Sequence, residues 1–214
     1  AGRPLGRSLA ARHCRLRGLT GALPGPEALR YGAEVPVSAY RDGGPMRPAL
    51  LAGILDPGGT LCAVEITYLT PNGRRALDLR LPRKTIGVTP PGCAVRLDPL
   101  AEELLVGEGV FTTRSASEWF GLPGWALQST RNLRAWIPPA GVRSLVIAGD
   151  RGKDGEASAE RLRLRAVETG VAATVALPPE PWGDWNEWST RQGSRPAGSQ
   201  RGKEGTERVR PGAG

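Results

Sequence analysis

The chain has 214 residues, 39% of them hydrophobic, which is enough for one large or two small folded domains. Three widely spaced cysteines and a single histidine argue against a zinc finger or zinc ribbon, and no apolar run approaches the length of a membrane-spanning helix. The odd cysteine count without a secretory signal favours a reducing compartment, so we expect a cytoplasmic protein with no membrane contact. The net charge of +8 fits an anionic partner, most simply nucleic acid, or a basic surface without one.

The first hundred residues read as β-rich and basic. A short helix is predicted over 8–17, ending at Gly18. Two strands, over 50–55 and 61–69, are separated by a glycine-rich turn, and a second turn at 70–73 continues the hairpin meander. Basic side chains then gather within eleven residues, at Arg74, Arg75, Arg80, Arg83 and Lys84. They either contact phosphates or form the solvated face of a hairpin.

Beyond residue 100 the pattern changes to strands that alternate with helices. Strands are predicted over 103–107, 125–128, 144–148 and 171–177, and helices over 112–120 and 156–169. Such alternation is typical of an α/β domain with a largely parallel sheet. From residue 189 to the end, six basic and two acidic residues accompany almost no apolar ones, which predicts a disordered basic tail.

Acidic residues follow two of the predicted strands directly. Glu108 comes after the strand at 103–107, and Asp150 after the strand at 144–148. Sites in open α/β sheets form beyond the carboxyl ends of the strands, so neighbouring strands would bring both carboxylates into one crevice. Oxygen ligands of this kind suit Mg²⁺ or Mn²⁺. Alternatively, Asp154 caps the helix, Asp150 stabilises a turn and Glu108 charges a helix N-terminus.

The tryptophans have two interpretations. Trp119, Phe120, Trp125 and Trp136 lie near predicted elements and are expected in the core. A second set, spaced by three, comprises Trp182, Trp185 and Trp188. These rings either stack on single-stranded bases or pack the end of the last strand onto the domain.

Three stretches of the second half resemble the Toprim domain of bacterial, phage and plasmid primases. They are "LLVGEGVFTTRSASEWFGLPGWAL", "VRSLVIAGDRGKDGEASAERL" and "VALPPEPWGDWNEW". They show, in order, a strand with Glu108-Gly109, a strand with Asp150 and a glycine five residues on, and a closing Asp184-Trp185-Asn186. The resemblance covers roughly residues 100–188. It extends upstream, because "LLAGILDPGGTLCAVEITYLTPNGRRALDLRLPRKTIG" is similar to the segment that precedes Toprim in these primases.

The resemblance implies roles for single residues. Glu108 resembles the family's general acid/base or metal-adjacent glutamate, and Asp150 the first aspartate of its Asp-x-Asp metal motif. Gly152 stands where the second aspartate is expected, which removes a metal ligand, and Asp154 is a candidate substitute two residues later. Phosphate or nucleic-acid contacts are expected from the basic residues Arg74, Arg75, Arg83, Lys84 and Lys153.

The resemblance also implies a fold and a function. We expect a basic primase-like subdomain over 1–100, a Rossmann-like Toprim domain over 101–188 and a disordered tail over 189–214. The implied reaction is primer synthesis by nucleotidyl transfer on single-stranded DNA, with Mg²⁺ or Mn²⁺, from nucleotides. Without a zinc domain or a motor, the chain is either a fragment or works with a helicase or another replication protein. Two alternatives remain: a metal-dependent nuclease, and a non-catalytic nucleic-acid-binding module motivated by Gly152.

Overall fold

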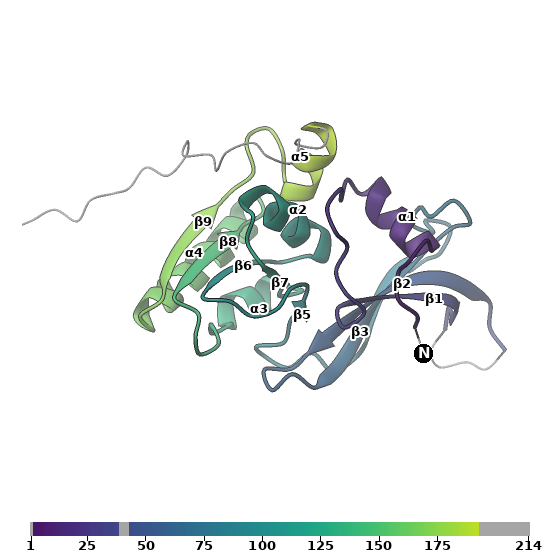
Figure 1. The fold of residues 1–214 in the computed structure, drawn as a ribbon, viewed down its shortest axis with the longest axis horizontal. Helices are drawn as coiled ribbons and strands as arrows, with labels where there is room; N and C mark the ends of the chain where they lie inside the picture. Colours follow the sequence, from purple (N-terminus) through teal and green to yellow (C-terminus); the bar gives the residue numbers. More distant parts are fainter. Residues whose placement is uncertain (1, 39–42, 193–214) are drawn as a thin grey trace, which may run out of the picture.

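The structure is a computed structural model that describes residues 2–38 and 43–192. It contains two β-sheets that stand side by side, one from each half of the chain (Figure 1). No helix within these residues is long and apolar enough to cross a membrane.

The N-terminal sheet is antiparallel, with the order β1-β2-β3-β4. Its strands are β1 (Leu29–Pro36), β2 (Met46–Leu55), β3 (Leu61–Tyr68) and β4 (Arg83–Gly87). Helix α1 (Leu9–Leu16) packs on one face, and the Ser8 hydroxyl caps it by accepting a hydrogen bond from the Ala11 N–H at 3.2 Å. The predicted helix and both predicted strands are confirmed. Strands β1 and β4 were not predicted.

The C-terminal sheet has the order β5-β7-β6-β8-β9, and only β5 runs antiparallel to its neighbour. Its strands are β5 (Val95–Arg96), β6 (Glu103–Gly107), β7 (Gly124–Ala126), β8 (Ser144–Ala148) and β9 (Ala172–Ala176). Its helices are α2 (Val110–Phe120), α3 (Thr130–Ala135), α4 (Lys153–Glu168) and α5 (Trp185–Gln192). The expected α/β fold behind a β-rich subdomain is therefore confirmed; helices α3 and α5 were not predicted.

Both faces of the C-terminal sheet are covered by helices. Alternate residues of β6 point to opposite sides, so Leu104 and Val106 pack with α3 and α4, whereas Leu105 packs with α2 and α5. Strands β6 and β8 are parallel neighbours, with Gly107 opposite Ala148. This adjacency, which the sequence could not establish, brings the two acidic strand ends to one edge.

Tryptophan packing follows the simpler interpretation for most rings. Trp185 and Trp188 are buried between α2 and α5, with ring centroids 5.4 Å apart in an edge-to-face contact. Trp125 and Trp136 lie in the core as expected. Trp119 keeps 37% of its surface exposed and meets Trp188 edge-on at 4.4 Å, so the prediction of a core position is wrong for this ring. Phe120 is equally exposed, so the prediction of a core position is wrong for this ring too.

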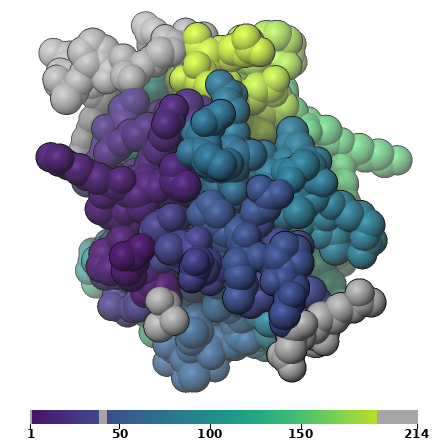
Figure 2. Space-filling view, turned by 90° about the vertical axis from the view of Figure 1, so that its right-hand side faces the viewer, coloured from purple at the N-terminus to yellow at the C-terminus, as the bar shows by residue number. Residues whose placement is uncertain are grey.

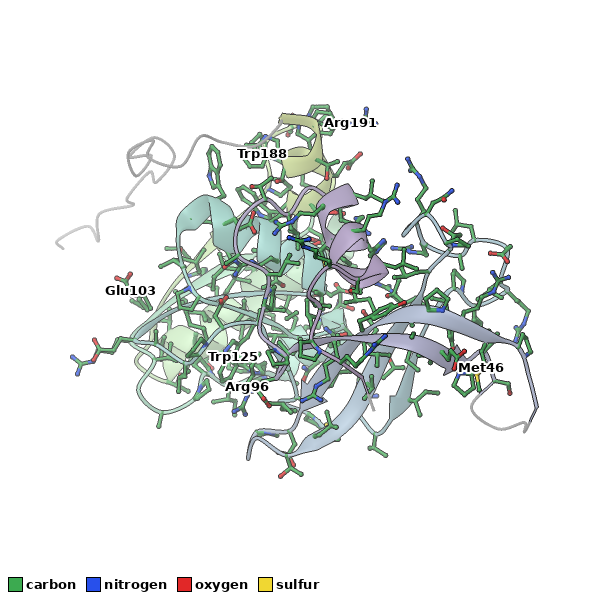
Figure 3. All side chains as sticks on the ribbon, turned by 45° about the vertical axis from the view of Figure 1, so that its right-hand side comes forward. Met46, Arg96, Glu103, Trp125, Trp188 and Arg191 are labelled. Atoms are coloured by element: carbon green, nitrogen blue, oxygen red, sulfur yellow. The ribbon has the colours of Figure 1, made fainter. Side chains whose placement is uncertain are left out.

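The two halves are joined by backbone pairing and by hydrogen bonds from Arg96, whose side chain also stacks on Trp125 within the C-terminal sheet. Leu55 and Ala94 exchange two backbone hydrogen bonds of 2.9 Å. The Arg96 guanidinium lies 4.5 Å from the ring centroid of Trp125, and both residues are labelled in Figure 3. Arg96 also donates to the carbonyls of Asp56 and Pro57 at 2.9 and 3.0 Å. The sheets are therefore fixed relative to each other, which matters for any site between them.

The last described helix is tied to the first. Figure 2 shows α5, in yellow, beside the purple N-terminal segment. Asn186 is 2% exposed, and its side-chain amide donates to the Arg17 carbonyl at 2.6 Å and to the Ser115 hydroxyl at 3.0 Å. Its amide oxygen accepts from Arg17 Nε at 2.7 Å. Helix α5 includes residues 189–192, the start of the predicted tail; the rest of that tail lies outside the described residues.

We predict that Asn186→Ala lowers the free energy of unfolding by about 2–4 kcal/mol, because the half-buried Arg17 side chain, its carbonyl and the buried Ser115 hydroxyl lose their hydrogen bonds to Asn186. Urea denaturation followed by circular dichroism measures the change. The matched control is Asn72→Ala, at an exposed turn position, with an expected change within about 0.5 kcal/mol. Equal losses in the two variants would show that Asn186 does not join the helices.

Candidate metal centre and arginine cluster

Two glycines allow the acidic strand ends to take their positions. A Cβ on Gly155 would lie 2.4 Å from the Asp150 carbonyl oxygen, so only glycine lets the first turn of α4 approach the end of β8 this closely. A Cβ on Gly107 would lie 2.7 Å from the Thr113 hydroxyl, so the end of β6 fits tightly against α2. Glu103, labelled in Figure 3, marks the opposite, amino end of β6. The glycine five residues after Asp150 is thus a packing requirement of this corner.

Four carboxylates interact at this edge of the sheet. Burial, followed by the charges of Asp184 and Glu108, raises the pKa of Asp150 from 3.8 to about 7. Burial also raises the pKa of Glu108, Asp154 adds to the increase, and Arg83 opposes it. Glu108 therefore interacts with both Asp154 and Asp150, and Asp150 also interacts with Asp184. We call Asp154, Glu108, Asp150 and Asp184 the carboxylate row.

One oxygen in this row is suited to a cation. Asp150 Oδ1 is buried and meets no hydrogen-bond donor among the described residues. An unpaired buried carboxylate oxygen is costly, and either a proton or a metal ion relieves the cost. Within residues 2–38 and 43–192, no three His, Cys, Asp or Glu side chains are grouped to hold a metal by themselves. Mg²⁺ typically uses one or two carboxylates and completes its shell with water and substrate phosphates, and carboxylate oxygens such as Asp150 Oδ1 match that preference.

Two arginines from the N-terminal half interact with members of the carboxylate row, Arg17 with Asp184 and Arg83 with Glu108. Burial lowers the pKa of Arg17, the charges of Arg75 and Arg83 lower it further, and Asp184 opposes them. Arg83 Nε lies 3.9 Å from Glu65 Oε2, and Arg83 also interacts with Glu108. We call Arg17, Arg75 and Arg83 the arginine cluster. Three mutually repelling cations beside carboxylates form a surface that a phosphate group would stabilise.

The remaining basic candidates lie elsewhere. Lys84 points to the opposite face of β4 from Arg83, where its Nζ donates to the Val37 carbonyl at 2.6 Å and lies 5.2 Å from the Tyr68 ring centroid. Arg74 and Lys153 are exposed. Of the predicted site residues, Glu108 interacts with Asp150 and with Arg83, and Lys84 is in an internal contact. Arg75 interacts with Arg17 and Glu65.

Sequence reasoning missed Arg17, Asp184 and Glu65 as site residues. Asp184 was noted within the closing motif, which was the available signal. Arg17 sits at the end of α1, 167 positions before Asp184, and nothing in its local sequence marks it apart from its charge. Glu65 lies within strand β3, and nothing in its local sequence marks it as a site residue. Only the folded arrangement of the two halves identifies these three.

Helix α4 begins without a side-chain cap from Asp154. Its first residue follows Gly152, whose N–H donates to Glu156 Oε1 at 3.0 Å. Asp154 instead contacts Arg134 of α3. The alternative in which Asp154 caps the helix is therefore wrong, although its negative charge still favours the first turn.

Comparisons with known proteins agree with this arrangement. Residues 103–195 match the Toprim domain, and residues 1–97 match a domain of unknown function, DUF7146. The chain is a Toprim-domain protein. No curated protein matches its sequence.

The fold is that of DnaG-type primase catalytic domains from bacteria and phage. The primase fragment of the bacteriophage T7 primase-helicase is 14% identical with a TM-score of 0.52, covering 85% of this chain and 66% of that one. A DNA primase domain from Pseudomonas aeruginosa is 18% identical with a TM-score of 0.52, covering 88% and 69%. A DnaG primase catalytic domain bound to single-stranded DNA is 14% identical with a TM-score of 0.51, covering 88% and 71%. The chain therefore spans about two thirds of the length of these relatives.

The raised pKa of Asp150 predicts a pH-dependent loss of stability. The Asp150 carboxyl binds a proton more tightly in the folded state than in the unfolded state. The stability that this proton contributes is therefore fully present below about pH 4 and is lost as the pH rises through about 7. Asp150→Asn lacks this loss. With divalent ions chelated, we compare the free energies of unfolding of Asp150→Asn and the wild type. We expect their difference to shift in favour of the variant by about 1–3 kcal/mol between pH 4 and pH 8, allowing for partial solvent screening. Urea denaturation across this range measures it; a difference that does not change with pH would contradict the buried site.

Proposed function

We propose that the protein catalyses metal-dependent nucleotidyl transfer, making primers on single-stranded DNA. The observation that carries the proposal is the unpaired, buried Oδ1 of Asp150, set in a carboxylate row that faces the arginine cluster. Carboxylates for a divalent cation on one side and arginines for phosphates on the other are what phosphoryl transfer requires.

Each side of the site would have its own task. Asp150 and Glu108 would hold Mg²⁺ or Mn²⁺, which when bound neutralises phosphate charge and orients the triphosphate. Arg17, Arg75 and Arg83 would bind phosphates of the nucleotide and the template. Burial raises the pKa of Glu108, which makes it a better proton acceptor for the attacking hydroxyl.

The proposed partners follow from charge and from the fold. A net charge of +8 favours a nucleic acid, and one solved relative with this fold is bound to single-stranded DNA. Another is the primase part of a primase-helicase, so a helicase or other replication protein is the proposed protein partner, in the cytoplasm.

A second function is favoured by one observation. Gly152 replaces an expected metal ligand, and its backbone, with φ 112° and ψ 156°, is in a region essentially restricted to glycine. An aspartate at position 152 would therefore be strained in the backbone conformation that this turn adopts. A non-catalytic nucleic-acid-binding module would tolerate that change, and its binding would be salt-sensitive without needing divalent ions.

Primer synthesis is tested by incubating the protein with single-stranded DNA, labelled ribonucleotides and Mg²⁺ or Mn²⁺. We expect short RNA products that fall at least about 100-fold in Asp150→Asn and Glu108→Gln. Arg83→Gln should reduce them about ten-fold through lost phosphate binding. The matched control is Arg161→Gln, an exposed arginine of α4, which should match the wild type.

Other outcomes would replace the proposal. DNA binding without products, unaffected by Glu108→Gln, would indicate the binding module. Shortening of a labelled strand without added nucleotides would indicate the Toprim nuclease considered from the sequence.

A further inference from the structure

The face of the N-terminal sheet that points away from α1 is apolar and only partly covered. Side chains alternate along each strand, so Ile54 packs with α1 on one face and Leu51 lies on the other, which we call the outer face. At one end of the outer face, Ala76 of the segment between β3 and β4 is buried with Ala49 and Tyr68. The rest forms a hollow of about 300 Å³, lined by Val35, Pro36, Leu51, Val64, Ile66 and Ile86.

One row of side chains crosses the outer face from edge to edge of the sheet. The strand register places Arg30 of β1 opposite Leu51 of β2. Leu51 is opposite Ile66 of β3, and Ile66 is opposite Lys84 of β4. Directly paired residues of an antiparallel sheet point to the same face, so the row has two apolar side chains in the middle and a cation at each end. With strands about 4.8 Å apart, the backbone positions of the two cations are about 14 Å apart.

The two cations of this row are oriented by neutral groups. Arg30 is exposed, and its guanidinium donates to the carbonyls of Pro26 and Gly2 at 2.7 and 3.3 Å. Lys84 Nζ donates to the Val37 carbonyl at 2.6 Å. The ion pairs formed within residues 2–38 and 43–192 include neither cation. A carbonyl orients a cation without neutralising its charge, so both ends of the row favour a carboxylate from outside.

We propose that the outer face is a docking surface for a helix of a partner protein, one whose apolar stripe is flanked by acidic residues. The stripe would fill the hollow over Leu51 and Ile66, and the acids would pair with Arg30 and Lys84. This inference goes beyond the proposed function and does not depend on the metal site, because strand alternation places Arg83 and Glu65 on the opposite face.

A helix suits this surface for two reasons. The sheet offers side chains of its face and not the backbone of an edge, so the partner has to satisfy its own backbone hydrogen bonds, as a helix does. At 1.5 Å per residue, about ten residues of helix span the 14 Å between the cations, which places the acids about three turns apart.

Single-stranded nucleic acid matches the outer face less well. Phosphates would gain from the two cations but not from the apolar middle of the row. The six residues that line the hollow include no aromatic ring on which a base could stack.

The experiment measures the binding of a synthetic, fluorescently labelled helical peptide to the full chain by anisotropy. The peptide has about 14 residues, with leucines along one face and two glutamates at each end. We expect a dissociation constant on the order of 10–100 μM. Two control peptides, with the glutamates replaced by lysines or the leucines by serines, should bind at least about ten-fold more weakly.

Variants of the chain locate the peptide on the outer face. Arg30→Glu should raise the dissociation constant about five- to twenty-fold, because it turns one attraction into a repulsion, and Lys84→Gln about two- to five-fold. Val64→Thr adds a hydroxyl to the hollow at nearly constant shape and should raise it about three- to five-fold.

The matched controls for these variants are Arg161→Glu and Val167→Thr, both at exposed positions of α4, which should bind the peptide like the wild type. Circular dichroism confirms folding. If Arg30→Glu does not fold, Arg30→Gln replaces it, with an expected increase in the dissociation constant of about two- to five-fold.

Four results would overturn the proposal. The first is no binding of the glutamate peptide up to about 1 mM. The second is binding that Arg30→Glu, Lys84→Gln and Val64→Thr all leave unchanged, which would place the peptide elsewhere. The third is displacement of the peptide by an equal concentration of single-stranded DNA, which would assign the outer face to nucleic acid. The fourth is a dimer in sedimentation equilibrium that Val64→Thr dissociates, which would show that a second copy of the chain covers this face.

Discussion

The parallel pairing of β6 with β8 is the constraint on which the site depends. It sets Gly107 opposite Ala148, so the chain leaves both strands at one edge and presents Glu108 and Asp150 together. Burial and, after it, the charges of Asp184 and Glu108 disfavour the ionised form of Asp150, and its raised pKa expresses that cost. The fold therefore places unfavourable negative charge at this edge, and the binding of a proton or a cation neutralises it.

The second half of the site comes from the other sheet. Backbone pairing between Leu55 and Ala94 fixes the N-terminal sheet against the Toprim domain, and Asn186 holds the end of α1 beside α5. As a result Arg17 and Arg83 stand across from acids that lie far away in the sequence. The carboxylate row comes from the C-terminal half and the arginine cluster from the N-terminal half, so the proposed phosphate chemistry belongs to the junction of the two sheets.

Local patterns predicted much of this fold and part of its site. The apolar strands ending at Gly107 and Ala148 were clear because buried parallel strands leave continuous apolar runs. Helix α3 was missed because it has only six residues, and helix α5 because it begins in a polar stretch bounded by Pro and Gly. The site depends on contacts between distant segments, so Arg17 could not be predicted. The contact of Lys84 with the Val37 carbonyl was hidden for the same reason, since strand alternation decides which basic residue faces the acids.

We propose that Asp150, a member of the carboxylate row, provides the oxygen that binds the divalent cation. Crystals of the protein soaked in Mn²⁺ and measured at the manganese absorption edge test it most directly. We predict an anomalous peak about 2.0–2.6 Å from an Asp150 carboxylate oxygen, with Glu108 beside it. A map without a peak there, in which a protein donor occupies Asp150 Oδ1, would contradict the claim.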